Sequence, residues 1–127
     1  MAEEVRLIRP GERVADPPLP GMIRETAVAT DGMWAGLART RPEMDSGWHH
    51  HGDYESAIYV VSGALWMHFG AEGEETLDAE PGDFIFVARG AVHRETNPTG
   101  EESEIVVVRA GFGQPVFNVD GPGPTAG

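Results

Sequence analysis

Short runs of alternating apolar and polar residues, separated by glycine and proline, fill most of the chain. This pattern is typical of β-strands in an antiparallel sheet, where successive side chains point to opposite faces. No stretch keeps a helical period, and the longest candidate, at 71–79, is interrupted by Gly73. The sequence therefore predicts an all-β sandwich or barrel. The predicted strands are Val5–Arg9, Ile23–Thr30, Met33–Thr40, Ser56–Val61, Ala64–Phe69, Glu75–Ala79, Asp83–Val87, Ala91–Thr96, Glu104–Ala110 and Val116–Val119.

A length of 127 residues predicts one domain with one core. Residues 10–21 hold four Pro and two Gly, so we expect residues 1–20 to form an N-terminal arm or lead-in strand. The barrel domain is expected over residues 21–120. Residues 121–127 consist of Gly, Pro, Thr and Ala and are expected to form a flexible C-terminal tail.

Charge and composition exclude several functions. The chain has 21 acidic and 9 basic residues, all of the latter Arg, and a formal net charge of −12. With no basic cluster, we expect no binding to nucleic acid or to an anionic membrane surface. The absence of Lys and Cys excludes Schiff-base chemistry, disulfides and thiolate metal sites. No apolar run approaches the roughly 20 residues of a membrane span, and the N-terminus does not resemble a signal peptide, so we expect a cytoplasmic protein.

Three consecutive histidines are the strongest chemical signal. In an extended segment His49 and His51 point to one face and His50 to the other. Glu55 follows His51 by four residues, and His93 lies on a distant strand. Two imidazoles from one strand, a carboxylate from the next and a third imidazole could converge inside a barrel. Such a set suits one divalent transition metal ion with open positions for substrate, and Fe, Mn, Zn, Ni, Co and Cu all remain candidates.

Two segments resemble the two motifs of the cupin superfamily. The first is His49-x-His51-x3-Glu55, followed by Gly63, and the second runs from Gly82 through Gly90 and His93 to Asn97. The resemblance is to a small single-domain cupin, and it implies an antiparallel double-stranded β-helix, the jelly-roll barrel. It further implies that the metal lies inside one end of the barrel. The implied metal ligands are His49, His51, Glu55 and His93.

The first motif departs from the family pattern by one residue. Seven residues separate Glu55 from Gly63, where the family has six, so strand register alone would put Ser56 at the carboxylate position. A β-bulge could absorb the extra residue and keep Glu55 pointing inward. We expect Glu55 to be a ligand; the alternative is a three-histidine site completed by water.

Further candidates surround this expected centre. His68, if it faces inward, is the best general acid or base. Arg39 could bind a substrate carboxylate, and Tyr54 could be a further polar group inside the barrel. The expected pocket or outer-sphere residues are His50, Trp48, Tyr59 and Trp66.

Two functions compete at this point. The first is a metal-dependent enzyme of oxygenase or lyase, cyclase or isomerase type acting on a small organic molecule. The second is a non-catalytic module that binds or senses a small molecule; a structural protein with a vestigial site is a further alternative. The resemblance also implies a homodimer. A polar group beside the metal, in addition to its ligands, would favour catalysis.

Overall fold

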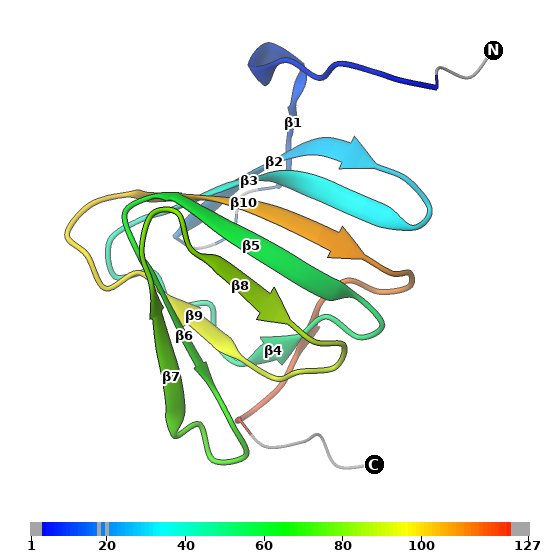
Figure 1. Ribbon diagram of the computed structural model, residues 1–127. Helices are drawn as coiled ribbons and strands as arrows, with labels where there is room; N and C mark the ends of the chain where they lie inside the picture. The colour runs from blue at the N-terminus through cyan, green and yellow to red at the C-terminus, as the bar shows by residue number, and fades with distance from the viewer. Residues whose placement is uncertain (1–3, 18, 20, 123–127) are drawn as a thin grey trace.

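The computed structural model describes residues 4–17, 19 and 21–122, and its regular structure is almost entirely β-strand. A six-stranded antiparallel sheet, in the order β1-β2-β3-β10-β5-β8, forms one layer (Figure 1). A three-stranded sheet, β7-β6-β9, and the short pair β11-β4 lie opposite it. The strands are β1 (Val14–Ala15), β2 (Met22–Ala29), β3 (Met33–Thr40), β4 (His49–His50), β5 (Glu55–Ser62), β6 (Leu65–Phe69), β7 (Glu75–Ala79), β8 (Phe84–Val87), β9 (Arg94–Thr96), β10 (Ser103–Ala110) and β11 (Phe117–Asn118).

The core lies between the two layers. Ile105 and Val107 of β10 are buried, whereas their neighbours in the strand are more exposed, which is the alternation of a sheet with one covered face. Ile58 and Val60 of β5 continue this inward face. From the opposite layer, Leu65, Met67 and Ala79 complete the core. The architecture is thus the predicted double-stranded β-helix, or jelly roll.

The strand predictions held wherever a segment has a pairing partner. β3 and β7 have the predicted bounds, and most others differ by one to three residues. The strand predicted at Val5–Arg9 is wrong: Val5 is exposed, that segment pairs with no described strand, and a short 3-10 helix follows at Pro10–Glu12. The short strands β1 and β4 lie outside the predicted strand ranges. Residues 1–3, 18, 20 and 123–127, which include parts of the predicted arm and tail, lie outside the described residues.

The outer face of the six-stranded sheet carries exposed aromatic residues. Phe84 and Phe86 of the edge strand β8 are 74% and 68% exposed, while Ile85 and Val87 point inward. Tyr59 of β5 packs against Phe84 on this outer face.

The predicted homodimer stays a prediction. Among the described residues, no helix has the length and apolar character needed to cross a membrane.

Candidate metal centre

The structure brings three of the predicted ligands together at one end of the barrel. His49 starts β4 and pairs through its backbone with His93, each N–H donating to the other carbonyl at 2.9 Å. The ring of His49 lies 4.3 Å from that of His93 and 4.9 Å from that of His51, between centroids. All three side chains are buried. The alternation of His49 and His51 on one face therefore holds.

The backbone fixes which ring nitrogen of each histidine is free. The Nδ1 of His49 lies 3.0 Å from the carbonyl of Gly47, that of His51 lies 2.8 Å from Pro115, and that of His93 lies 2.9 Å from Ala91. Because a carbonyl can only accept, each Nδ1 must carry the hydrogen and donate it. The lone pair of a neutral ring is then on Nε2. This is the arrangement in which protein histidines bind metals.

Glu95 supplies the fourth polar group. It is 7% exposed, and its Oε1 lies 3.4 Å from Nε2 of His93. One ligand atom from each of His49, His51, His93 and Glu95 can be chosen so that all lie within 4.8 Å of one another. Because Glu95 follows His93 by two residues at the start of β9, the two side chains share a face. The same alternation that pairs His49 with His51 could have identified Glu95 from the sequence.

Glu55 is not part of this group, which corrects the sequence prediction. It points to the outer face of β5, where its carboxylate pairs with Arg89 at 3.1 Å. Ser56 points inward and is buried. The pairing of Glu55 and Ser56 with β10 is regular, and the irregularity of β5 lies at its other end, opposite Glu104 and Ile105. A bulge there cannot turn Glu55 inward.

The electrostatics favour a cation. Burial alone would raise the pKa of Glu95, but the contact with His93 and the nearby rings of His49 and His51 outweigh it and lower the pKa to about 2. Burial lowers the pKa of His49, and burial together with the charge of Arg109 lowers that of His51 to about 3. Burial also acts to lower the pKa of His93, but the contact with Glu95 raises it overall. At neutral pH the group therefore offers an anionic carboxylate and the neutral imidazoles of His49 and His51.

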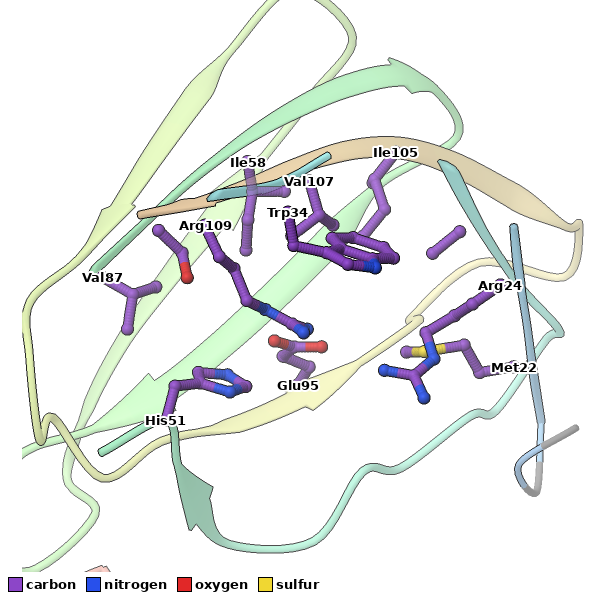
Figure 2. Close-up of a pocket in the computed structure, with 12 residues that line it drawn as sticks. Met22, Arg24, Trp34, His51, Ile58, Val87, Glu95, Ile105, Val107 and Arg109 are labelled. Atoms are coloured by element: carbon purple, nitrogen blue, oxygen red, sulfur yellow. The ribbon is translucent and has the colours of Figure 1, made fainter. Parts of the chain in front are cut away.

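A cavity of about 430 Å³ opens beside these ligands. A smaller void of about 30 Å³ adjoins it and shares several of its walls (Figure 2). Figure 2 shows the side chains of Arg24 and Arg109 extending from β2 and β10 toward Glu95. The larger cavity is lined by Leu19, Met22, Arg24, Met44, Asp45, Ser46, His49, His51, Glu95, Arg109, Val116 and Asn118.

Two of the three polar residues predicted to assist at the site, His68 and Arg39, lie elsewhere. His68 is on the outer face of the three-stranded sheet, where its Nε2 lies 3.2 Å from Oγ1 of Thr96. Arg39 is on the outer face of β3 and pairs with Glu25 and Glu104. Neither side chain reaches the cavity, because each occupies the outward position of its strand. Tyr54 is not among the described residues that line the cavity.

The predicted pocket residues also pack outside the cavity. His50 stacks on Phe117 of β11, with 4.8 Å between centroids and 10° between planes, and so holds the C-terminal strand against β4. Trp66 shares the outer face of β6 with His68, and Tyr59 packs on Phe84. Trp48 lies under the guanidinium of Arg94. The aromatic residue that does border the void is Trp34.

The sequence comparisons identify the class of protein. The family model described as "Cupin domain" matches residues 36–109, more than half of the chain. The chain therefore belongs to the cupin family, as the two motifs predicted. No curated protein matches this sequence.

Solved structures show the same fold in distant relatives. An uncharacterized conserved protein with a double-stranded β-helix domain from Klebsiella pneumoniae is 22% identical, with a TM-score of 0.73 over 92% of this chain and 99% of that one. The polyketide cyclase RemF from Streptomyces resistomycificus is 22% identical, with a TM-score of 0.74 over 91% and 86% of the two chains. KdgF from Halomonas sp. is 18% identical, with a TM-score of 0.73 over 85% and 96%. At these identities the likeness concerns the fold alone.

The group fits the divalent metal ion that the family implies. Nε2 of His93 is fully buried, forms no hydrogen bond within the described part of the chain and lies 3.4 Å from Oε1 of Glu95, as expected of two neighbouring ligand atoms. Three imidazole nitrogens and one carboxylate oxygen form a donor set that first-row transition metals accept. The four residues His49, His51, His93 and Glu95 could hold such an ion.

Proposed function

We propose that the protein is a metal-dependent enzyme that acts on a small organic substrate at a mononuclear centre. The ligands are Nε2 of His49, His51 and His93 and the carboxylate of Glu95. One observation carries the proposal: three buried histidines, each with Nδ1 bound to a backbone carbonyl, gather with a buried carboxylate so that one ligand atom from each lies within 4.8 Å of the others. Buried polar groups without such a purpose would cost stability.

The chain prepares this centre in three ways. The carbonyls of Gly47, Pro115 and Ala91 fix the tautomer and orientation of each ring, so that little reorganisation is needed on binding. The contact between Glu95 and His93 keeps the carboxylate ionised. The cavity of about 430 Å³ borders His49, His51 and Glu95 and offers space for a substrate beside them. A bound metal ion would act as a Lewis acid toward substrate oxygens or activate water or O2.

The class of reaction is proposed as oxygenase or lyase, cyclase or isomerase. Support for the second group comes from the resemblance to RemF, which is a polyketide cyclase. The alternative is a non-catalytic cupin that binds or senses a small molecule. Catalysis is favoured because two arginines line the cavity in addition to the ligands, which gives the site polar groups that can position a substrate.

Calorimetric titration of Mn(II), Co(II), Ni(II) and Zn(II) into metal-free protein tests the centre. We expect one ion per chain and a loss of binding in His93→Ala. His68→Ala is the matched control, since it removes a histidine from the outer face and should leave the affinity unchanged. Equal binding by the wild type and His93→Ala would refute the ligand assignment.

Proton relaxation of water around the Mn(II) form tests whether the centre is open to the cavity. An open coordination position exchanges water and enhances relaxation, and a small molecule that enters the cavity reduces the enhancement. A centre that binds Mn(II) without any enhancement would be closed. That result would support a structural metal and exclude the proposed catalysis.

A further inference from the structure

We infer that Arg24 and Arg109 form a binding site for the carboxylate of a small organic substrate in the cavity beside the metal ligands. This inference names the substrate class and rests on the proposed function for the role of that substrate. The site is distinct from the ligand group, because both guanidiniums come from the six-stranded sheet and the ligands come from the opposite layer and the loops next to it.

Both arginines occupy inward positions of their strands. Arg24 precedes the bulge of β2 and pairs with Ala38, a core residue, while Arg109 continues the inward face of Ile105 and Val107 in β10. Such positions usually hold apolar side chains. Burying an arginine at such a position takes its charge out of water. This costs free energy unless another interaction offsets the lost hydration.

Among the described residues, neither arginine has a carboxylate within ion-pair distance. Nε of Arg24 and Nε of Arg109 are fully buried and have no hydrogen-bond partner within the described part of the chain. The contrast with Arg13, Arg39 and Arg89 is clear, since each of these pairs with a glutamate. In a chain with 21 acidic and 9 basic residues, two arginines with a buried Nε and no ion pair among the described residues are unexpected unless a ligand provides a carboxylate.

The charged groups around the cavity favour the binding of an anion. Burial and the charge of Arg24 lower the pKa of Arg109, whereas the charges of Glu95, Tyr54 and Asp16 raise it, so the repulsion between the two guanidiniums is only partly offset. Of the acidic groups that line the cavity, Asp45 pairs with Arg94 at 3.1 Å and Glu95 contacts His93. A metal ion on Glu95 would add further positive charge. A carboxylate between the two arginines would relieve this repulsion.

Arg109 is already oriented for such a ligand. Its Cζ lies 5.1 Å from the ring centroid of Trp34, and Nε1 of Trp34 donates to Oγ1 of Thr26 at 3.1 Å. The indole is thereby fixed, and the guanidinium lies over it. The N–H edge of a guanidinium that is supported on its face remains free to donate two parallel hydrogen bonds to a carboxylate.

The rest of the cavity favours an organic molecule over an inorganic anion. Leu19, Met22, Met44 and Val116 contribute apolar walls, and about 430 Å³ is the size of a small-molecule site. A carboxylate held by the arginines would leave the organic part of the molecule in this apolar space, next to the ligand group. The shape and chemistry therefore select a carboxylic acid.

Fluorescence of Trp34 tests the inference directly. In a Trp48→Phe, Trp66→Phe background it is the only tryptophan, and it contacts Arg109. We expect saturable changes with malonate or succinate, in the Zn(II)-loaded and the metal-free protein, and none with malonamide or succinamide. Arg24→Gln and Arg109→Gln should each weaken binding roughly tenfold or more, because each removes charged hydrogen bonds. Arg41→Gln, which alters an exposed arginine, is the matched control and should bind as the parent does.

Arg109→Lys keeps the charge but not the paired N–H groups, so we expect an affinity between those of the parent and Arg109→Gln. This variant and circular dichroism separate loss of the site from loss of the fold. Any one of four results would overturn the inference: no response to either dicarboxylate, equal binding of the amides, unchanged binding in both Gln variants, or tighter binding of inorganic phosphate.

Calorimetric metal titration of the same variants distinguishes the two proposals. Metal binding without carboxylate binding refutes only this inference, and carboxylate binding without metal binding refutes only the proposed metal centre.

Discussion

Two buried polar clusters lie at opposite ends of the inward face of β10, and they differ in how completely they are bonded. One surrounds Ser103 at the start of the strand, and the other surrounds Arg109 near its end. Both interrupt an otherwise apolar face formed by Ile105 and Val107. Burying polar groups is costly at either end, so the way in which each cluster offsets that cost indicates its purpose.

The side chains of Asn97 and Ser103 in the first cluster are bonded within the protein, although Oγ1 of the adjacent Thr40 has no hydrogen-bond partner among the described residues. Nδ2 of Asn97 lies within 3.2 Å of the carbonyls of Thr40, Arg41 and Glu101, and its Oδ1 accepts from the backbone and hydroxyl of Thr99. Oγ of Ser103 donates to the carbonyl of Ala64 and accepts from its N–H. Gly63 leaves room for this contact, since a Cβ there would collide with Ser103. These bonds join three loops and serve the fold.

The cluster at the other end is incompletely bonded. Nε2 of His93 and Nε of Arg109 have no hydrogen-bond partners among the described residues, although the Nδ1 atoms of the three histidines do. A set of groups that is held rigidly by outer contacts but open at its centre is suited to a ligand. The comparison teaches that burial alone does not mark a site, whereas unused donors and lone pairs directed to one point do.

Removal of a histidine ligand should have the largest effect. We expect His49→Ala and His51→Ala each to weaken metal binding by more than roughly 100-fold, above the range found for outer contacts of metal ligands. Competition with a chelating dye measures this loss. Asn97→Ala, in the bonded cluster, should retain the wild-type affinity; a comparable loss in that variant would mean that the two clusters are not independent.

The choice of carboxylate gives the next test. Glu95→Gln keeps the size of the side chain but removes its charge, so we expect metal affinity to fall by roughly tenfold or more. Glu55→Gln should leave metal affinity unchanged, because Glu55 lies outside with Arg89. Calorimetric titration of metal into both variants shows which of the two carboxylates is the ligand. The opposite ranking would restore Glu55 as a ligand and contradict the present assignment.

The bonded cluster should matter for stability. Asn97→Ala leaves buried carbonyls without their donor, and we expect the free energy of unfolding to fall by about 1–3 kcal/mol. Denaturant unfolding of the metal-free protein measures this change. Thr99→Ser, which retains the hydroxyl, is the mild control. If Asn97→Ala were as stable as the wild type, the bonded cluster would have no structural purpose.

The incompletely bonded cluster at the Arg109 end of β10 should make the stability of the metal-free protein sensitive to acid. The pKa of His51 is about 3 in the folded protein and 6.5 ordinarily, so between these values the unfolded chain binds the proton and stability falls as the pH falls. His49 acts in the same direction, and Glu95, with its lowered pKa, adds a loss below about pH 4.5. The raised pKa of His93 opposes this trend, since it favours the folded state until the pH rises through that value.

Thermal unfolding from pH 7 to pH 4 measures the balance. We expect the midpoint to fall on acidification and to fall less in His51→Gln, which has no proton to bind. A midpoint that rises on acidification would show that His93 dominates the cluster.

The sequence carried more information about the strands than about the faces inside the barrel. Alternation and turn residues placed β3, β7 and β10, and the two motifs brought His49, His51 and His93 together, because these signals are local. The family spacing favours Glu55 as the carboxylate, whereas the structure supplies Glu95 from His93-x-Glu95, an equally local pair. Arg39 and Arg109 each lie in a predicted strand, and the sequence does not show which of the two side chains faces inward. The pairing of the strands shows that Arg109 does and Arg39 does not. Long-range register is set by tertiary packing, which one sequence does not display.

The most direct test of the account is elemental analysis by plasma mass spectrometry. Tag-free protein would be offered an equimolar mixture of Mn(II), Co(II), Ni(II) and Zn(II), desalted and measured beside a His51→Ala, His93→Ala double variant. The account predicts close to one transition-metal ion per chain in the wild type and almost none in the double variant, with both proteins folded. Equal metal contents in the two proteins, or no retained metal in the wild type, would contradict it.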